Sequence, residues 1–309
     1  MKKKILIAVD GSIHSKNAVR YAVQASSFVN DLNYTILNVQ PVISQFLTDE
    51  AKRSVKARSA LEKFNKQQAE ISTSLLEFYK AQMIQMNIDS KLIDIKTLPR
   101  KTGLAKDILE YAQENRYDAI VVGRRGLSRL QEVFMGSLTT ILLEHSKAVP
   151  VWVVDGDITS SKIMIAVDGS ESALRAVDHL SFMVGKNPNI SITLFHVIPN
   201  IKDYCPVDFD DKTGELEDII IQGDKRCVEN FFVHAIRKFK DACIMENQIQ
   251  IKEEHGSGNV GKMIADEAKK GNYGTVVIGR SGMNKSFFMG SVSKYVIDKA
   301  SGFAVWLVS

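Results

Sequence analysis

Hydrophobic and polar positions follow two different periods along this chain. Short continuous apolar runs, typical of strands buried on both faces of a parallel sheet, predict strands. In the N-terminal half we expect strands at residues 4–9, 34–39, 91–97, 119–123 and 149–154, the first of which is a continuous apolar run. Between them, apolar residues recur at helical spacing. The predicted helices cover residues 12–29, 57–86, 104–114 and 136–146. Residues 42–56 fit neither period, and we expect a mobile insertion there.

The same order of elements returns in the second half because the sequence repeats itself. ILIAVDGS at residues 5–12 matches IMIAVDGS at residues 163–170 in seven of eight positions, at an offset of 158. Three further pairs follow: VVGRRG at 121–126 with VIGRSG at 277–282, FMGS at 134–137 with FMGS at 288–291, and VPVWVV at 149–154 with FAVWLV at 303–308. The polar segment 155–161 is rich in turn formers. We therefore expect one domain over residues 1–155 and a second over residues 162–309.

Strands and helices that alternate five times in each half predict an α/β fold. We expect two tandem doubly wound, Rossmann-like domains, each with a five-stranded parallel sheet. Ligands of such sheets bind beyond the carboxyl ends of the strands, near the switch point in strand order. Asp10, Val39 and Gly123 all follow or end predicted strands, so they can converge on one crevice.

One stretch has the form of a strand that feeds a glycine-lined loop and then a helix. It runs from Ile120 to Leu138 and reads IVVGRRGLSRLQEVFMGSL. Glycine permits positive φ and close approach of a ligand to the main chain. Free N–H groups and the positive end of the following helix favour an anion. The alternative is a plain strand-to-helix turn, which more often needs one glycine than three.

Composition narrows the class of protein. Of 309 residues, 45% are hydrophobic and 25% charged, which is ordinary for a globular protein. No run approaches the roughly 18 to 20 consecutive apolar residues of a membrane span. Cys205, Cys227 and Cys243 show no metal-ligand spacing, which favours a reducing cytoplasm without disulfides. We expect Cys227 and Cys243 to be buried as small apolar side chains.

The charge is divided unevenly between the halves but is modest in both. Residues 1–155 hold 22 Lys and Arg against 16 Asp and Glu, a balance of +6, and residues 156–309 hold 18 against 20, a balance of −2. Such values are weak evidence for a nucleic-acid partner. We expect neither nucleic acid nor a membrane as a partner.

Four residues carry a resemblance to a known family. Gly123, Gly126, Gly136 and Ser137 form the pattern G-x2-G-x9-G-S, which resembles the nucleotide-binding signature of universal stress proteins. The AVDGS strand end, the position of Val39 and the terminal VPVWVV strand also match that family. The likeness covers essentially the whole chain as a tandem pair. It implies a stress-response or regulatory module that binds ATP or a related adenine nucleotide, with or without Mg²⁺.

The resemblance implies a role for each matching residue. Val39 would meet adenine through its main chain, Asp10 and Gly123 would hold the ribose, Val122 would line the pocket, and Gly126, Gly136 and Ser137 would cradle the phosphates. These roles suit the chemistry, because a carboxylate accepts hydrogen bonds from hydroxyl groups and a helix start offers free N–H donors.

Two of these assignments have alternatives. For Asp10 the alternative is structural, since Asp-Gly-Ser after a strand is also a common cap and turn. Arg124 and Arg125 are further candidates for phosphate contact, against the alternative of solvated arginines in an exposed loop.

The second half departs from the signature in its spacing. Gly279 and Gly282 are separated from Gly290 and Ser291 by seven residues instead of nine. Asp168 and Val197 keep their places, as does Ser291. The candidates for a second site are Asp168, Val197, Gly279, Gly282, Gly290 and Ser291. However, the shorter loop between Gly282 and Gly290 must follow a tighter path. We therefore expect nucleotide mainly in the first half, and a weaker or empty second site.

A second glycine-rich segment, GSGNVGKM at residues 256–263, imitates a phosphate-binding loop. Met263 stands where a P-loop needs Ser or Thr to hold Mg²⁺, so an independent phosphate site there is the lesser alternative. The chain has no HExxH and no GxSxG motif. We expect no catalytic residue and no protein metal site, and at most slow ATP hydrolysis.

Assembly is implied by the resemblance as well. Single-domain members of the family commonly dimerise through the last strand, so residues 149–154 and 303–308 are expected to pair within this chain as a pseudo-dimer. The whole chain would also form a homodimer. The alternative function is a nucleotide-independent dimerisation or interaction scaffold for a protein partner that the sequence does not identify.

Overall fold

The computed structural model describes residues 2–125, 135–198, 215–256, 258–281 and 289–309. The first half contains five strands and five α-helices among these residues: β1 (Lys3–Ala8), α1 (Ile13–Gln24), β2 (Leu32–Val39), α2 (Gln45–Arg53), α3 (Val55–Gln85), β3 (Ile93–Leu98), α4 (Leu104–Glu114), β4 (Ala119–Gly123), α5 (Ser137–His145) and β5 (Val151–Val154). The second half repeats this order with β6 (Ile163–Val167), α6 (Glu171–Val184), β7 (Ile192–Ile198), α8 (Glu215–Asp241), β8 (Ile249–His255), α9 (Val260–Lys270), β9 (Thr275–Gly279), α10 (Ser291–Lys299) and β10 (Ala304–Val308).

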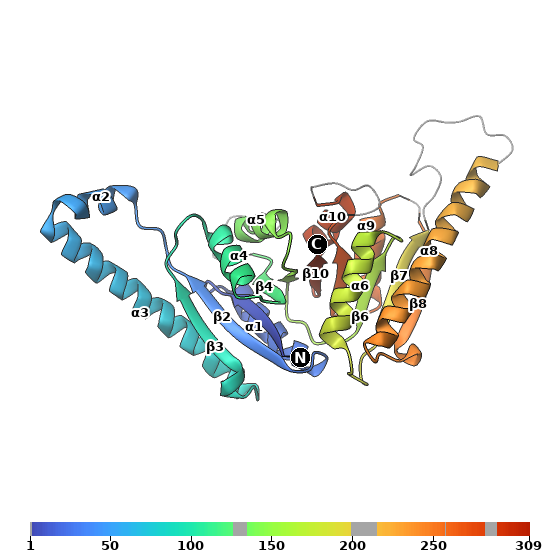
Figure 1. Cartoon of the computed structure of the whole chain (residues 1–309), viewed down its shortest axis with the longest axis horizontal. Coiled ribbons are helices and arrows are strands. Elements are labelled where there is room, and N and C mark those ends of the chain that lie inside the picture. Colours follow the sequence, from blue (N-terminus) through green and yellow to red (C-terminus); the bar gives the residue numbers. More distant parts are fainter. Residues whose placement is uncertain (1, 126–134, 199–214, 257, 282–288) are drawn as a thin grey trace.

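All ten strands belong to a single sheet, in the order β3-β2-β1-β4-β5-β10-β9-β6-β7-β8. Within each half the five strands are parallel, which confirms the predicted α/β class. The halves join where β5 and β10 pair antiparallel, with Trp152 opposite Trp306. The expected pairing of the terminal strands within the chain is therefore present, and it merges two five-stranded sheets into one (Figure 1).

Helices cover both faces of the sheet because its inner strands are apolar on both sides. Along β1, Ile5 and Ile7 pack into one buried cluster, whereas Leu6 and Ala8 pack into the other. The first cluster takes its helical residues from α1, α3, α6 and α8, and the second from α4, α5, α9 and α10. This is the layering of a doubly wound fold.

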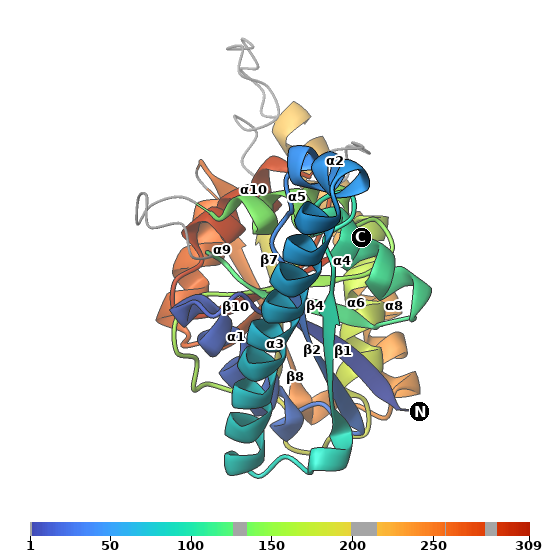
Figure 2. The same cartoon turned by 90° about the vertical axis from the view of Figure 1, so that its left-hand side faces the viewer.

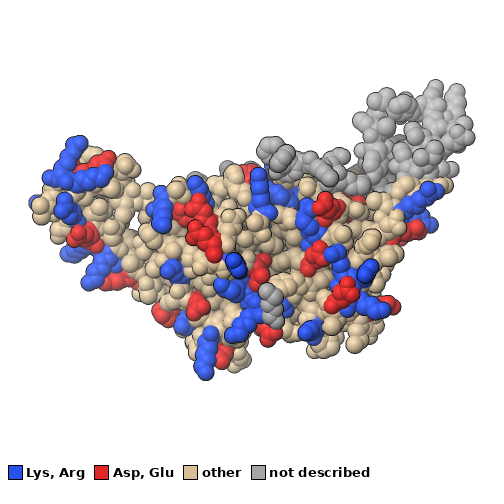
Figure 3. Space-filling model, viewed as in Figure 1, with Lys and Arg blue, Asp and Glu red and all other residues tan. Residues whose placement is uncertain are grey.

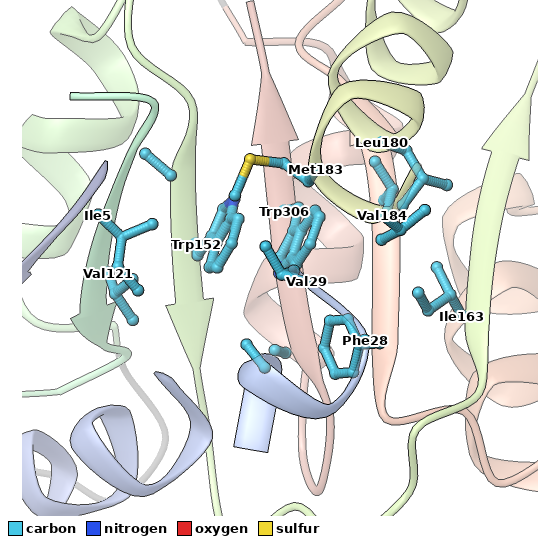
Figure 4. Packing of buried hydrophobic residues seen from close by; sticks show 14 of the residues in the cluster. Ile5, Phe28, Val29, Val121, Trp152, Ile163, Leu180, Met183, Val184 and Trp306 are labelled. Atoms are coloured by element: carbon cyan, nitrogen blue, oxygen red, sulfur yellow. The ribbon is translucent and has the colours of Figure 1, made fainter. Parts of the chain in front are cut away.

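The two tryptophans form the centre of the junction between the halves. Their rings are stacked, with centroids 3.8 Å apart and an interplanar angle of 1°. Figure 4 shows the pair from close by. Trp306 Nε1 donates to the Tyr21 hydroxyl at 2.8 Å, and Trp152 Nε1 donates to His179 Nε2 at 3.3 Å. Tyr21 and His179 occupy equivalent positions of α1 and α6. Burial lowers the pKa of His179 to about 3, so that its Nε2 stays available as an acceptor.

Residues 42–56, where we expect a mobile insertion, contain the helix α2 with Ser44 as its cap, accepting from Leu47 N at 3.3 Å. The mobility of this segment stays a prediction. The expected burial of Cys227 and Cys243 is wrong, because both are exposed. Cys227 lies beside the buried face of α8, which is built from Val228, Phe231, Phe232, Ala235 and Phe239, and Cys243 follows the helix in a turn with φ 62°.

The long helix α3 extends past the sheet, and α2 packs against its first turns (Figures 1 and 2). Lysine and arginine side chains are interspersed with acidic ones over the face drawn in Figure 3. Among the described residues, no helix combines the length and the apolar character needed to cross a bilayer.

Candidate functional site

The register of the strands brings the predicted first-half residues to one edge of the sheet. Ala8 pairs with Leu37 and Ile7 with Val121. Continued by two residues, this register sets Asp10 beside Val39, and Gly123 ends the neighbouring strand β4. Val122 is buried under the same edge, and Gly136 and Ser137 open α5. Gly126 lies outside the described residues.

Asp10 has a structural role in the first half. Its Oδ1 accepts hydrogen bonds from Ser12 N at 3.0 Å and from Ser15 Oγ at 2.7 Å. Ser12 in turn caps α1 by accepting from Ser15 N at 3.1 Å. The cap-and-turn alternative is thus realised here, and the carboxylate is oriented by this network at the edge where a ligand would bind.

Gly123 has a packing role that the signature alone does not reveal. A Cβ at this position would lie 2.7 Å from the main chain of His14, in the first turn of α1. The equivalent Gly279 faces Ser172 in the same way, and a Cβ there would lie 2.6 Å from the Ser172 hydroxyl. Glycine at the end of β4 and β9 therefore lets α1 and α6 cross the sheet edge closely.

Both helices that open with the glycine-serine pair begin without a side-chain cap. Gly136 precedes α5 and Gly290 precedes α10, and neither can offer a capping side chain. In contrast, Ser12, Ser170 and Asn259 cap α1, α6 and α9. The first N–H groups of α5 and α10 are donors that an anion can accept from.

The second half contains a pocket of about 520 Å³ at the corresponding edge. All the described second-site candidates line it: Asp168, Val197, Gly279, Gly290 and Ser291. Gly282 lies outside the described residues. The floor and walls are mostly apolar, and they include side chains that the sequence did not single out: Phe195, Val260, Ile264, Ile278 and Met289. A volume of this size suits a small organic ligand.

The carboxylate of this pocket is held less firmly than its first-half counterpart. Asp168 Oδ1 accepts from Ser170 N at 3.0 Å, as Asp10 does from Ser12. Ala173 stands where the first half has Ser15, so Asp168 lacks the hydroxyl donor that Asp10 receives.

The P-loop-like segment contributes side chains to this pocket. Asn259 Oδ1 accepts from Lys262 N at 3.1 Å and so caps α9. Val260 and Ile264 line the pocket, and Met263 packs partly buried against the sheet. Ser257 lies outside the described residues. The helix start is therefore already occupied by its own side chain.

The arginines of the first glycine loop contact other groups of the protein. Arg124 is buried, its Nη1 donates to the carbonyl of Asp298 at 2.6 Å, and its Nε lies 3.4 Å from Asp155 Oδ2. Arg125 Nη2 lies 3.9 Å from the same carboxylate. In the described chain, no group of three or more His, Cys, Asp or Glu side chains could hold a metal ion.

Comparison with known proteins identifies relatives of both halves. The model of the universal stress protein family matches residues 1–155 and again residues 159–308. A universal stress protein of Mycolicibacterium smegmatis is 26% identical over 215 residues, a match that spans 66% of this chain and 66% of that protein.

Solved structures share the whole architecture. A universal stress protein from Archaeoglobus fulgidus superposes with a TM-score of 0.66 at 18% identity and covers 99% of this chain and 98% of its own. A structure from Pseudomonas aeruginosa UCBPP-PA14, assigned to the same family, gives 0.58 at 14% identity, with 99% and 93% covered. A universal stress protein in complex with cAMP aligns with 49% of this chain and 96% of its own, at 22% identity and a TM-score of 0.35.

Proposed function

Since the chain belongs to the universal stress protein family, we propose that it binds ATP or a related adenine nucleotide at the carboxyl edge of its sheet and acts as a stress-response or regulatory module. The observation that carries the proposal is the pocket of about 520 Å³, which is lined by every described residue of the second signature. Its volume falls within the range of small-molecule sites.

Each part of a nucleotide finds suitable chemistry there. The apolar walls from Phe195, Ile264 and Ile278 suit a flat base. Asp168 can accept hydrogen bonds from ribose hydroxyls, because a carboxylate has more acceptor positions than the one that Ser170 N uses. The uncapped start of α10 at Gly290 and Ser291 suits phosphate oxygens. In the first half, Asp10, Val39, Val122, Gly123, Gly126, Gly136 and Ser137 would do the same.

The two halves differ in the loop that would enclose the phosphates. The first half keeps nine residues between its second and third glycines, and the second half has seven. We infer tighter binding in the first half, where the longer loop matches the family signature. The pocket lined by Asp168 supports a weaker second site over an empty one.

Titration with a fluorescent ATP analogue tests the proposal. We expect saturable binding by the intact chain and loss of the tighter phase in Gly136→Val, whose added side chain would block the start of α5. Gly290→Val should remove the weaker phase. Each loss should be at least about tenfold in affinity, or about 1.4 kcal/mol. Gly223→Val is the matched control, because Gly223 lies on α8 with open space around its Cβ position.

The absence of saturable binding at millimolar nucleotide would contradict the proposal and favour the interaction scaffold. Unchanged binding in both valine variants would move the site elsewhere. We place this module in the cytoplasm, with no nucleic acid or membrane as its partner. A homodimer of the whole chain and a protein partner that senses the bound nucleotide complete the proposal. Hydrolysis of ATP would be slow at most.

A further inference from the structure

Two arginines cross from one half of the molecule to the other. Arg124 directly follows β4, and Arg280 occupies the equivalent position after β9. Both are buried, with 4% and 7% of their surface exposed. A buried guanidinium needs partners for its donors, and here the opposite half supplies them.

Arg280 binds the carboxyl end of α5. Its Nη1 donates to the carbonyls of Leu143 at 2.6 Å and Ser146 at 2.9 Å, and its Nη2 donates to the carbonyl of Glu144. The last carbonyls of a helix have no partner within the helix and carry the negative end of its dipole. Arg280 thus caps a helix that belongs to the first half.

Arg124 makes the reciprocal contact. Its Nη1 donates at 2.6 Å to the carbonyl of Asp298, in the last turn of α10. Asp155, at the end of the first half, compensates its charge from 3.4 Å. The two halves therefore exchange equivalent arginines, and each arginine holds the end of the other half's last helix.

The main chains of the same arginines hold the other ends of these helices. Gly136 N donates to the Arg124 carbonyl at 2.9 Å, and Gly290 N donates to the Arg280 carbonyl at 2.9 Å. As a result, α5 is fixed at its start by Arg124 and at its end by Arg280. A helix of nine residues spans only about 13 Å. The same holds for α10 with the two arginines exchanged.

We propose that Arg124 and Arg280 couple the two nucleotide sites, so that binding in one half strengthens binding in the other. This inference rests on the proposed function. A ligand at Gly136 and Ser137 restricts the start of α5 and the Arg124 carbonyl beside it. The Arg124 side chain then restricts the end of α10, whose start belongs to the second site. A second ligand then loses less conformational entropy when it binds, so its affinity rises. Thermodynamic linkage requires that each site raise the affinity of the other by the same factor.

Hydrogen exchange of the full chain tests the coupling even where only one site is filled. In Gly290→Val, ATP should bind the first half alone. We expect amides in the last turn of α10 to exchange about fivefold more slowly with ATP than without it, the lower end of typical coupling. Helix α8, which packs on the opposite face of the sheet from α10, serves as the internal control.

Arg124→Lys, added to this background, removes the planar guanidinium but keeps the charge. ATP should still protect α5 in that variant, and the protection of α10 should disappear. The converse experiment uses Gly136→Val, in which ATP should bind the second half alone, and follows amide exchange at the end of α5. Adding Arg280→Lys to that variant should abolish the protection of α5. Exchange of α4 and α9 without ligand shows whether each variant is folded.

The outcomes separate this inference from the proposed function. If ATP protects α5 but leaves α10 unchanged, and the converse arm agrees, nucleotide binding stands and the coupling is refuted. Equal protection of α10 with and without the Arg124→Lys substitution would also refute it, because the signal would then bypass the arginine. If ATP protects neither half, the proposed function fails first and the coupling fails with it.

Discussion

At the scale of single residues, the two glycines that end β4 and β9 have a role in packing besides any contact with a ligand. For Gly123, contact with ribose remains a prediction. The close approach of the His14 main chain gives a separate reason for glycine, one that applies without any ligand. A motif of a binding site can thus also be a requirement of the fold, and a variant that loses binding must be checked for stability.

Gly123→Ala should therefore destabilise the protein by about 1–3 kcal/mol, because its Cβ would meet main-chain atoms that cannot move aside easily. Gly103→Ala is the matched control. It precedes α4 in an extended conformation with nothing within 4 Å of the added Cβ, so its stability should change by less than about 1 kcal/mol. Urea unfolding of both variants measures the difference. Equal stability of the two would show that α1 shifts freely away from β4.

At the scale of elements, strands were the best predicted part of the chain. The predicted strands at 4–9 and 119–123 agree with β1 (Lys3–Ala8) and β4 (Ala119–Gly123) to within one residue, because runs buried on both faces leave little ambiguity. The helix predicted over 104–114 has the bounds of α4. Because the sequence repeats itself, the same elements could be assigned in both halves.

Helix faces were harder to predict than helix bounds. Apolar residues recur at helical spacing along α3, yet Phe64, Ile71 and Phe78 are 42%, 55% and 55% exposed. The buried positions of α3 are instead Ser72, Leu76, Tyr79 and Met83. A helix with two apolar stripes does not reveal which one meets the sheet. The same limit applies to Cys227, one position away from the buried face of α8.

Two alanine variants distinguish the stripes of α3. Leu76→Ala, at a position only 1% exposed, should lower the free energy of unfolding by about 2–5 kcal/mol. Ile71→Ala, on the exposed stripe, should change it by less than about 0.5 kcal/mol. Chemical denaturation of the two variants checks this. A large loss for Ile71→Ala would mean that a second copy of the chain covers that stripe in solution.

The candidate site was predicted in part for the same reason. Strand ends are visible in a sequence, so Asp168, Val197 and Gly279 could be assigned to the site without knowledge of the pocket that they line. Phe195, Ile264 and Met289 could not, since nothing in an apolar strand or helix marks the residues that face a cavity. The sequence also did not reveal that the Arg124 side chain is buried, because the carbonyl to which it donates belongs to Asp298, 174 positions along the chain.

At the scale of the whole molecule, the halves are joined in one continuous structure. They share a continuous sheet, the exchanged arginines and the stacked rings of Trp152 and Trp306. Separating them would expose both indoles and leave the guanidinium donors and their helix carbonyls unpaired, which is costly. The halves should therefore unfold together, although each has the architecture of a complete domain.

Wild-type protein tests this without any substitution. The chain contains only two tryptophans, and both lie in the junction, so tryptophan fluorescence reports its separation. Far-UV circular dichroism reports the helices of both halves. We expect the two transitions in guanidinium chloride to coincide. A fluorescence change at clearly lower denaturant than the loss of helix would show that the halves part before they unfold.

The place of β10 in the sheet also sets the order of events during synthesis. β5 is complete at Val154, yet its neighbour begins at Ala304. At a usual elongation rate the ribosome needs roughly 10 to 30 s to make the intervening residues. Throughout that interval the first half can be folded while its apolar edge has no partner. Two nascent chains on one messenger could pair through this edge until β10 of the same chain covers it.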